Sequence, residues 1–293
     1  NEKELKTIDP ANYSASNYIG KIGIEHYYEE ELHGIVGYNQ VEVNATGQIV
    51  RILKHYPPIP GDNIYLSIDS KLQHIAHQAL EGERAGLVAI DPNTGKVLAM
   101  VSHPHYDPNL FVNGISNNDY QQLREATDKP LYNRAVRGLY PFGSTIKPFF
   151  ALQGLNEEIV SPETSVYCNG YFHLPGVAHE WRDWNHKKGG HGTVNVHDAI
   201  MESCDIYFYT LAQKMGITKM DAILNQFGFG ELTHIDLHEE LPGVVASPAW
   251  KKKNQHGNWY AGDTIISGIG QGFMLATPLQ LAHATATLAK RGQ

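Results

Sequence analysis

The chain has 293 residues, of which 42% are apolar and 18% are charged, so it can bury a sizeable core and is long enough for two domains. Its formal net charge of −8, with no basic run interleaved with aromatic residues, argues against a nucleic-acid partner. The sequence shows no long apolar run and no signal peptide, and it does not begin with Met, so we expect a trimmed piece of a longer protein.

The first 62 residues predict a small domain of short elements. The stretch "KIGIEHYYEEELHG" is typical of a short helix that ends at Gly34, and residues 41–44 and 48–53 predict two strands joined by a turn at 45–47. The segment "HYPPIPGDN" is rich in Pro and Gly and is typical of a linker. We therefore place a domain boundary after residue 62, with residues 63–293 forming the second domain.

The second domain begins with a predicted helix over residues 69–82, for which Asp69 is a suitable N-cap. Apolar side chains recur on one face of this helix: Leu72, Ile75, Ala76 and Leu80. Residues 87–90 and 97–101 flank the turn sequence "DPNTG" and predict a hairpin. Residues 102–140 are polar and rich in turn residues, and the chain beyond residue 144 reads as mostly helical.

The stretch "YPFGSTIKP" contains a candidate nucleophile. Ser144 and Lys147 are three residues apart, so on a helix their side chains share a face. Pro148 lacks an N–H and is tolerated only in the first helical turn, so the helix should start close to Ser144, with Pro141 and Gly143 forming the turn before it. A serine hydroxyl there would lie at the positive end of the helix, and Lys147 could accept its proton. The alternative is that Ser144 is a plain N-cap.

A second polar motif lies in "NVHDAIMESCDIYFYTLAQKMG". The pattern predicts a helix from about His197, a break at residues 203–205 and a further helix that ends at Gly216. Ser203 and Asp205 at such a joint can supply a hydroxyl for proton relay and a polar side chain for substrate.

The order of these motifs resembles that of the penicillin-binding transpeptidases across essentially the whole chain. The resemblance is carried by "AIDPNTGKVLAMVS", "YPFGSTIKP", "ESCDIYFY" and "SGIGQGFMLATPLQLAHATATLA". The segment "GKIGIEHYYEEELHGIVGYNQVEVNATGQIV" resembles the pedestal of the class B members, and "LYNRAVRGLYPFGSTIKP" with "GDTIISGIGQG" is most similar to their elongation-specific branch. This implies a mixed α/β fold, an antiparallel sheet flanked by helices plus an all-α lobe, with residues 1–62 as a dimerisation-type pedestal. "GIGQG" predicts a tight backbone turn near the active-site floor.

The resemblance also implies roles for four residues in a D,D-transpeptidase. Ser144 would attack the penultimate D-Ala carbonyl of a peptidoglycan stem peptide, and an amino group on a neighbouring stem would resolve the acyl-enzyme. Lys147 would be the base, Ser203 would relay a proton to the leaving amine, and Asp205 would orient Lys147 and the donor peptide. β-Lactams would acylate Ser144.

Two departures from the family pattern bear on this mechanism. Most relatives have Ser-x-Asn as the second motif, whereas this chain has Ser-x-Asp, as the elongation-type members do; an ionised Asp205 only accepts hydrogen bonds and should favour charged Lys147. The third motif, Lys-Ser/Thr-Gly on an edge strand, is absent from the sequence. We expect the C-terminal strands that carry it to lie outside this chain, and the chain alone to be crippled, because losing one oxyanion-hole donor costs roughly 10²–10³-fold in rate.

Two cysteines and two other residues suit a tetrahedral zinc ion: Cys168, Asp183, His191 and Cys204. Some elongation-type members have a similar set around the active site, which implies a structural zinc that fixes the backbone of the second motif. The alternatives are a Cys168–Cys204 disulfide or two buried thiols. Three further histidines are alternative ligands: His173, His179 and His186.

The leading hypothesis is a periplasmic transpeptidase domain of the elongation machinery, whose intact protein is anchored in the bacterial inner membrane. The resemblance implies stem peptides and β-lactams as ligands, and a rod-shape-system glycan polymerase and other elongation-complex proteins as partners. A serine β-lactamase is the second hypothesis, although the pedestal argues against it. The third is a penicillin sensor or scaffold module in which Ser144 is acylated without turnover.

Overall fold

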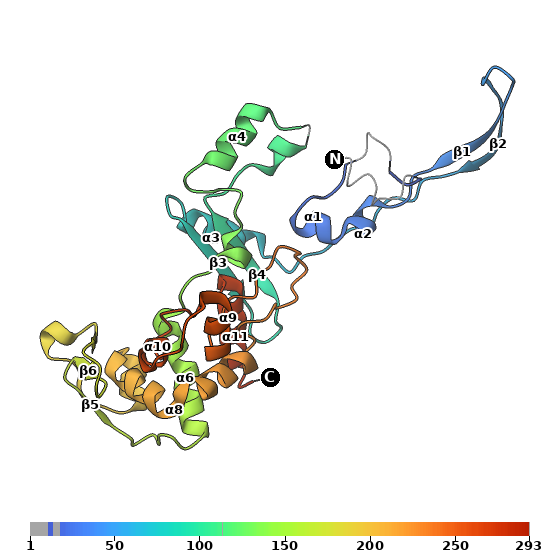
Figure 1. Cartoon of the computed structure of the whole chain (residues 1–293). Coiled ribbons are helices and arrows are strands. Elements are labelled where there is room, and N and C mark those ends of the chain that lie inside the picture. Colours follow the sequence, from blue (N-terminus) through green and yellow to red (C-terminus); the bar gives the residue numbers. More distant parts are fainter. Residues whose placement is uncertain (1–10, 14–17, 113, 293) are drawn as a thin grey trace. The chain divides into compact units, whose positions relative to one another are not determined.

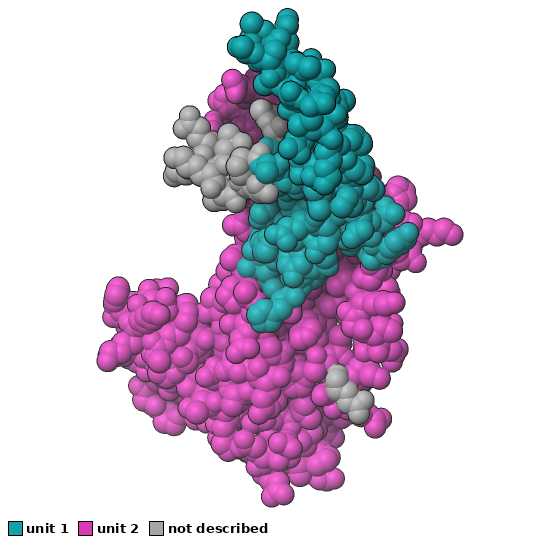
Figure 2. Space-filling model, turned by 90° about the vertical axis from the view of Figure 1, so that its right-hand side faces the viewer, with its two compact units in different colours: residues 1–66, 234–240 teal, residues 67–233, 241–293 magenta. Residues whose placement is uncertain are grey.

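The computed structural model describes residues 11–13, 18–112 and 114–292, and the chain forms two compact units (Figure 2). Unit 1 comprises residues 1–66 and 234–240, and unit 2 comprises residues 67–233 and 241–293. The chain therefore passes between the units after residues 66, 233 and 240. The sequence placed its boundary after residue 62 and did not indicate that residues 234–240 join the first unit.

Unit 1 is built from two short helices and a hairpin (Figure 1). Its elements are α1 (Gly23–Tyr27), α2 (Glu29–His33), β1 (Tyr38–Val43) and β2 (Ile49–Tyr56). The predicted single helix is interrupted at Tyr28 but ends at Gly34 as expected, where φ is +71°. The predicted hairpin is confirmed, with longer strands, and Asn44 Oδ1 organises its turn by accepting from the backbone N–H groups of Thr46 and Gln48. Segment 234–240 contributes Asp236, whose carboxylate accepts a hydrogen bond of 2.8 Å from Tyr28 Oη.

Unit 2 opens with a helix packed on a hairpin. The elements are α3 (Ser70–Ala79), β3 (Ala85–Ile90) and β4 (Val97–His103). Asp69 caps α3 as predicted, because its Oδ1 accepts from Lys71 N and Leu72 N. Ala76 packs into a small core with the hairpin, but Ile75 is 60% exposed, so the prediction that it shares one face with Ala76 is wrong. Adjacent helical residues are about 100° apart, and this turns Ile75 away from a face centred on Ala76.

Residues 104–142 hold short helices that the sequence pattern did not indicate. They are the 3₁₀ turn η2 (Pro108–Phe111), α4 (Asn117–Glu125) and α5 (Arg134–Arg137). Ser116 caps α4 by accepting from Asp119 N, while its own hydroxyl donates to the Asp119 carboxylate. No residue of α4 is buried, so the helix lacks the apolar stripe from which a helix is predicted in a sequence.

A helical lobe forms the larger part of unit 2. Its helices are α6 (Lys147–Asn156), α7 (Val196–Met201), α8 (Asp205–Gln226), α9 (Pro248–Gln255), α10 (Ala261–Ser267) and α11 (Pro278–Ala289). α8 packs against α6 and α10 and contributes much of the main core (Figure 1). The predicted helix end at Gly216 is confirmed: the φ of +75° and ψ of 159° at Gly216 are not helical, and a second helical segment follows directly, with Ile217 and Met220 buried.

Two small antiparallel ribbons lie between α6 and α7 in the sequence. β5 (Val166–Cys168) pairs with β8 (Gly192–Val194), β6 (Tyr171–His173) pairs with β7 (Glu180–Arg182), and the turn η4 (His186–Lys188) connects β7 to β8. The predicted mixed α/β class is confirmed. Within the described residues, no helix has both the length and the apolar character needed to cross a bilayer.

Candidate active site

Ser144 lies in a 3₁₀ turn, η3 (Gly143–Ile146), that runs directly into α6. Pro148 occupies the first turn of α6, so the predicted position of the helix start is correct to within one turn. Gly143 has φ +57°, which allows the chain to turn sharply just before the serine. The Ser144 side chain is exposed, so its hydroxyl is accessible to a substrate carbonyl.

The turn before Ser144 is held by the loop between α10 and α11. Gly143 N donates to Gly270 O at 2.9 Å, and Tyr140 and Ala276 exchange two backbone hydrogen bonds of 3.0 and 2.9 Å. Gly270 has φ +69°, and a Cβ atom there would overlap Gly143 O and lie 2.8 Å from Gly143 N. Only glycine therefore fits this contact. The sequence predicted a tight turn at "GIGQG" but gave no signal for its partner.

Lys147 is turned toward the second motif. Its side chain is 2% exposed, and Nζ lies 2.8 Å from Ser203 O, 3.1 Å from Ser203 Oγ and 2.6 Å from Asp205 Oδ1. An ammonium has three donors, and these three acceptors can take all of them. The spacing of the two residues predicted that the side chains of Lys147 and Ser144 would share one helix face. Among the described residues, the hydrogen bonds of Lys147 Nζ go instead to Ser203 and Asp205.

Ser203 forms the predicted break between α7 and α8. It has φ +52°, a left-handed conformation that is uncommon for a residue with a side chain and costs roughly 1–3 kcal/mol. This conformation directs both its carbonyl oxygen and its hydroxyl to the same lysine. Cys204 N donates to Ala199 O at 2.9 Å and fixes the chain as it enters α8.

Asp205 is the first residue of α8 and is buried. Burial raises the pKa of its carboxyl group; the hydrogen bond and the charge of Lys147 act in the opposite direction without cancelling the rise, and the Asp183 carboxylate adds to it. The Asp205 carboxyl group therefore ionises less readily than that of an exposed aspartic acid.

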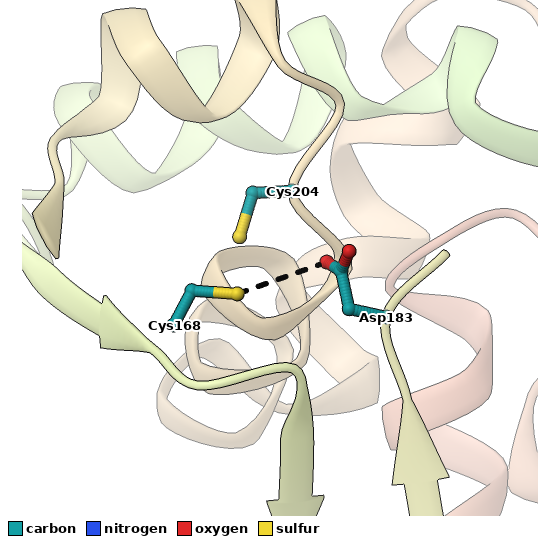
Figure 3. Close-up of side chains that lie close together, drawn as sticks. All are labelled: Cys168, Asp183 and Cys204. Atoms are coloured by element: carbon teal, nitrogen blue, oxygen red, sulfur yellow. Dashed lines mark hydrogen bonds between the residues drawn. The ribbon is translucent and has the colours of Figure 1, made fainter. Parts of the chain in front are cut away.

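Three of the four predicted zinc ligands meet in one cluster (Figure 3). The ligand atoms of Cys168, Asp183 and Cys204 all lie within 4.8 Å of one another, and all three residues are buried. Cys168 Sγ donates to Asp183 Oδ2 at 3.9 Å. Both cysteines are free thiols, so the structure contradicts the alternative of a Cys168–Cys204 disulfide.

His191 approaches this cluster through Asp183. Its Nε2 lies 3.0 Å from Asp183 Oδ1, and the ring is outside the group of three mutually close ligand atoms. The alternative histidines are also outside that group: His186 Nδ1 contacts the backbone oxygen of Asp183 at 2.8 Å, His173 contacts Glu180, and His179 packs on Trp181.

One carboxylate connects the cysteine cluster to the catalytic candidates. Asp183 Oδ2 accepts a hydrogen bond of 2.7 Å from Asp205 N, and its Oδ1 accepts one of 2.7 Å from Asn185 N. The first turn of α8 is therefore anchored on the cluster, and that turn carries the carboxylate that binds Lys147.

The donor set fits a zinc ion. Burial raises the pKa of the Cys204 thiol, and the neighbouring Cys168 and Asp183 add to the rise, so a thiolate there would be stabilised by a bound cation. Two sulfur atoms and a carboxylate in a closed, buried site suit zinc, whereas magnesium and calcium prefer oxygen ligands alone. A divalent cation here would also fix the position of Asp183.

Comparison with protein families gives two matches. Residues 85–293 match the penicillin binding protein transpeptidase domain, and residues 1–66 match the penicillin-binding protein dimerisation domain.

Individual proteins are similar over most or all of the chain. A peptidoglycan D,D-transpeptidase MrdA from Acinetobacter baumannii is 52% identical over 292 residues, covering 100% of this chain and 43% of that protein. The crystal structure of Pseudomonas aeruginosa PBP2 in complex with WCK 5153 is 50% identical with a TM-score of 0.90, covering 100% of this chain and 60% of the other. A complex between PBP2 and MreC from Helicobacter pylori gives 38% identity and a TM-score of 0.87, covering 93% and 51%. The chain thus spans less than half the length of the curated relative.

Proposed function

Because the chain belongs to the penicillin-binding protein transpeptidase family, we propose that it is part of a peptidoglycan D,D-transpeptidase that cross-links stem peptides during cell elongation. The observation that carries the proposal is the arrangement around Lys147. A buried lysine joins Ser203 and Asp205, three residues after an exposed serine in the turn that leads into a helix.

In the proposed reaction, Ser144 Oγ attacks the carbonyl of the penultimate D-Ala, and its proton passes to the amine form of Lys147. Asp205 Oδ1, 2.6 Å from Nζ, holds the lysine in place for this transfer. Ser203 Oγ, 3.1 Å from Nζ, relays the proton to the nitrogen of the departing D-Ala. An amino group of a second stem peptide then attacks the ester, forms the cross-link and restores the Ser144 hydroxyl.

Labelling with a fluorescent penicillin tests the nucleophile and the base in the full-length protein. We expect the wild type to form a stable adduct and to cross-link stem peptides, and the Ser144→Ala variant to form no adduct. Lys147→Arg keeps the charge but cannot accept a proton, so it should lose acylation by at least about 10²-fold. An adduct that persists in Ser144→Ala would overturn the assignment.

The fate of the adduct separates the rival functions. A wild-type adduct that is rapidly hydrolysed would indicate a serine β-lactamase, and a stable adduct without cross-linking activity would indicate a penicillin sensor. Either result would refute the proposed transpeptidase.

We further propose that the cysteine cluster holds zinc, with Cys168, Asp183 and Cys204 as ligands and His191 as the fourth. The ion would neutralise the thiolates and keep Asp183 fixed under the first turn of α8, a structural role. The support is the buried Cys/Asp/Cys group with His191 beside it.

Elemental analysis together with acylation kinetics tests the zinc proposal. We expect Cys204→Ser to lose zinc and to acylate more slowly, because the Asp183 carboxylate that accepts from Asp205 N would no longer be held in place by the ion. His173→Ala, which removes an exposed histidine from the adjacent ribbon, should keep both its zinc and its rate. A wild-type protein purified with far less than one zinc per chain would refute the site.

We also propose a cellular setting for the protein. We place the protein at the bacterial inner membrane with this chain in the periplasm, and we expect elongation-complex proteins as partners, as in the Helicobacter pylori PBP2–MreC complex. A rod-shape-system glycan polymerase stays a further predicted partner. Fractionation of cells and pull-down with the tagged full-length protein test these two points.

A further inference from the structure

A buried lysine in α9 lies outside the set of residues that the proposed reaction uses. Lys251 is 9% exposed and is the only buried residue of α9. Its Nζ donates to Asp263 Oδ2, in the first turn of α10, at 2.6 Å. Removing an ammonium from water costs free energy unless a partner replaces the water, and Asp263 is that partner. The pair therefore ties α9 to the start of α10.

Three aromatic rings surround the same ammonium. The distances from Nζ to the ring centroids are 5.0 Å for Phe273, 5.2 Å for Tyr260 and 5.9 Å for Trp259. A cation within about 6 Å of a ring centroid is attracted by the negative face of the ring. Trp259 and Tyr260 come just before α10, whereas Phe273 lies in the loop between α10 and α11. One charge thus contacts the chain at both ends of α10.

A series of hydrogen bonds connects Asp263 with the turn before Ser144. Ser267 Oγ donates to Asp263 O at 2.7 Å, Ser267 O accepts from Gly270 N at 2.9 Å, and Gly270 O accepts from Gly143 N at 2.9 Å. Ser267 is 1% exposed, so water does not compete for its two bonds. The last bond in the series crosses from the loop to the chain that leads into η3.

Phe273 gives Lys251 a second and more direct contact with this loop. It lies three residues after Gly270 and three before Ala276, and both of these residues form backbone hydrogen bonds with the chain that leads into η3. The ring of Trp250, next to Lys251 in α9, also packs on Phe273, with the centroids 5.8 Å apart. The middle of the loop is therefore held by α9, between the two points at which the loop holds the turn.

We propose that Lys251 is a positioning residue for the acylation of Ser144. It anchors α10 and the following loop on α9, and the loop fixes the turn from which Ser144 attacks. Within the described part of the chain, Lys251 forms no hydrogen bond with any of the four proposed catalytic residues, so it acts through the loop. The inference rests on the proposed function of Ser144.

The kinetics of acylation by penicillin test this inference in the full-length protein. We expect Lys251→Met to lower the maximal acylation rate by at least about tenfold and to change the half-saturating penicillin concentration by no more than about twofold, because the nucleophile is misplaced. Lys252→Met removes the neighbouring exposed lysine of the same helix and should acylate as the wild type does. A wild-type maximal rate in Lys251→Met would overturn the inference.

A double-mutant cycle tests the route through Asp263. Asp263→Asn removes the negative charge but keeps an oxygen that can accept from Tyr260 N, as Asp263 Oδ2 does at 2.8 Å. We expect this variant also to acylate slowly, and the double variant with Lys251→Met to be little slower than Lys251→Met alone, because the two side chains act as a unit. Losses that multiply in the double variant would show independent effects and would refute the route.

Hydrogen exchange without penicillin measures the position of the turn without using catalysis. At a temperature well below both melting temperatures, Lys251→Met should speed the exchange of the amides of Gly143 and Gly270, while the amides of the β3–β4 hairpin keep their rates. A variant that melts at a lower temperature but keeps the wild-type exchange at Gly143 and the wild-type acylation rate would show that Lys251 only stabilises the fold, and this would refute the inference.

The failure of the proposed function can be distinguished from the failure of this inference. A full-length wild type that forms no penicillin adduct refutes both. A wild type that is acylated on Ser144, together with a Lys251→Met variant that is acylated equally fast, leaves the proposed function intact and refutes the positioning by Lys251 alone.

Discussion

Lys147 donates hydrogen bonds to Ser203 and Asp205 from a position that is almost fully shielded from water. A charge in such a place is tolerated only when a partner is present, and Asp205 is the carboxylate that supplies the pairing. Asp205 is in turn held by its backbone N–H on Asp183. The lysine therefore depends on a side chain that is itself fixed by the cysteine cluster.

We predict that Asp205→Ala lowers the free energy of unfolding by about 3 kcal/mol and strongly reduces acylation, because it removes both the negative charge and the oxygen atom that faces the buried Nζ of Lys147. Asp205→Asn is the matched control: it keeps an oxygen that accepts from Lys147, so it should lose markedly less stability. Urea unfolding and penicillin labelling measure the two effects. Equal losses of unfolding free energy in the two variants would contradict this difference, because they would show that the negative charge of Asp205, and not its accepting oxygen, determines the stability.

At the scale of elements, the loop between α10 and α11 supports the turn that carries the proposed nucleophile, Ser144. The loop forms backbone hydrogen bonds with the chain before and after Pro141 and Phe142, through the pairs Tyr140–Ala276 and Gly143–Gly270. These bonds fix the direction in which the chain enters η3 and α6. The turn would otherwise rest on Gly143 alone, whose φ of +57° is compatible with many local conformations.

Gly270→Ala should destabilise the protein by about 2–3 kcal/mol and slow acylation, because its Cβ would push against the backbone of Gly143. Gly95→Ala in the β3–β4 turn has a nearly equal φ of +72° but no atom within 4 Å of the new Cβ, so it should cost only about 1 kcal/mol. Melting curves and labelling rates of the two variants distinguish the effect of the contact between residues 270 and 143 from the backbone strain that a positive φ causes at both positions. Equal effects on acylation would contradict the supporting role of the loop.

The features that could be predicted from the sequence are those with a local cause. Asp69 as a cap, the "DPNTG" turn and the break at Ser203 each depend on residues a few positions apart. The contacts that complete the site join distant parts of the chain: Lys147 with Asp205, Asp183 with the N–H of residue 205, and Gly143 with Gly270. No local pattern encodes such pairs. Helix α4 was missed for another reason, because it buries none of its side chains.

The whole molecule contains two units of unequal packing. Among the described residues, the buried hydrophobic side chains all belong to unit 2, and most of them lie in a large helical core or in a small core between α3 and the β3–β4 hairpin. The β1–β2 hairpin of unit 1 exposes many apolar side chains, among them Ile49, Val50, Ile52 and Leu53. A two-stranded hairpin without a covering layer is marginally stable in water.

Hydrogen exchange followed by mass spectrometry should therefore distinguish the two hairpins. We predict that the amides of β1–β2 exchange far faster than those of β3–β4, which is a hairpin of similar strand length covered by α3 and α11. Acylation by penicillin should slow exchange in unit 2, which contains Ser144, and the β1–β2 peptides should keep their rate. Comparable protection of the two hairpins in the free protein would contradict the difference in packing.

The carboxylate of Asp183 has a consequence for inhibition. It lies between the thiols of Cys168 and Cys204 and the backbone of Asp205, so an agent that captures those sulfur atoms would disturb the lysine pair without occupying the place of the substrate. Such an agent would be non-competitive with penicillin, and substitutions that reshape the mouth of the site around Ser144 would give no protection against it.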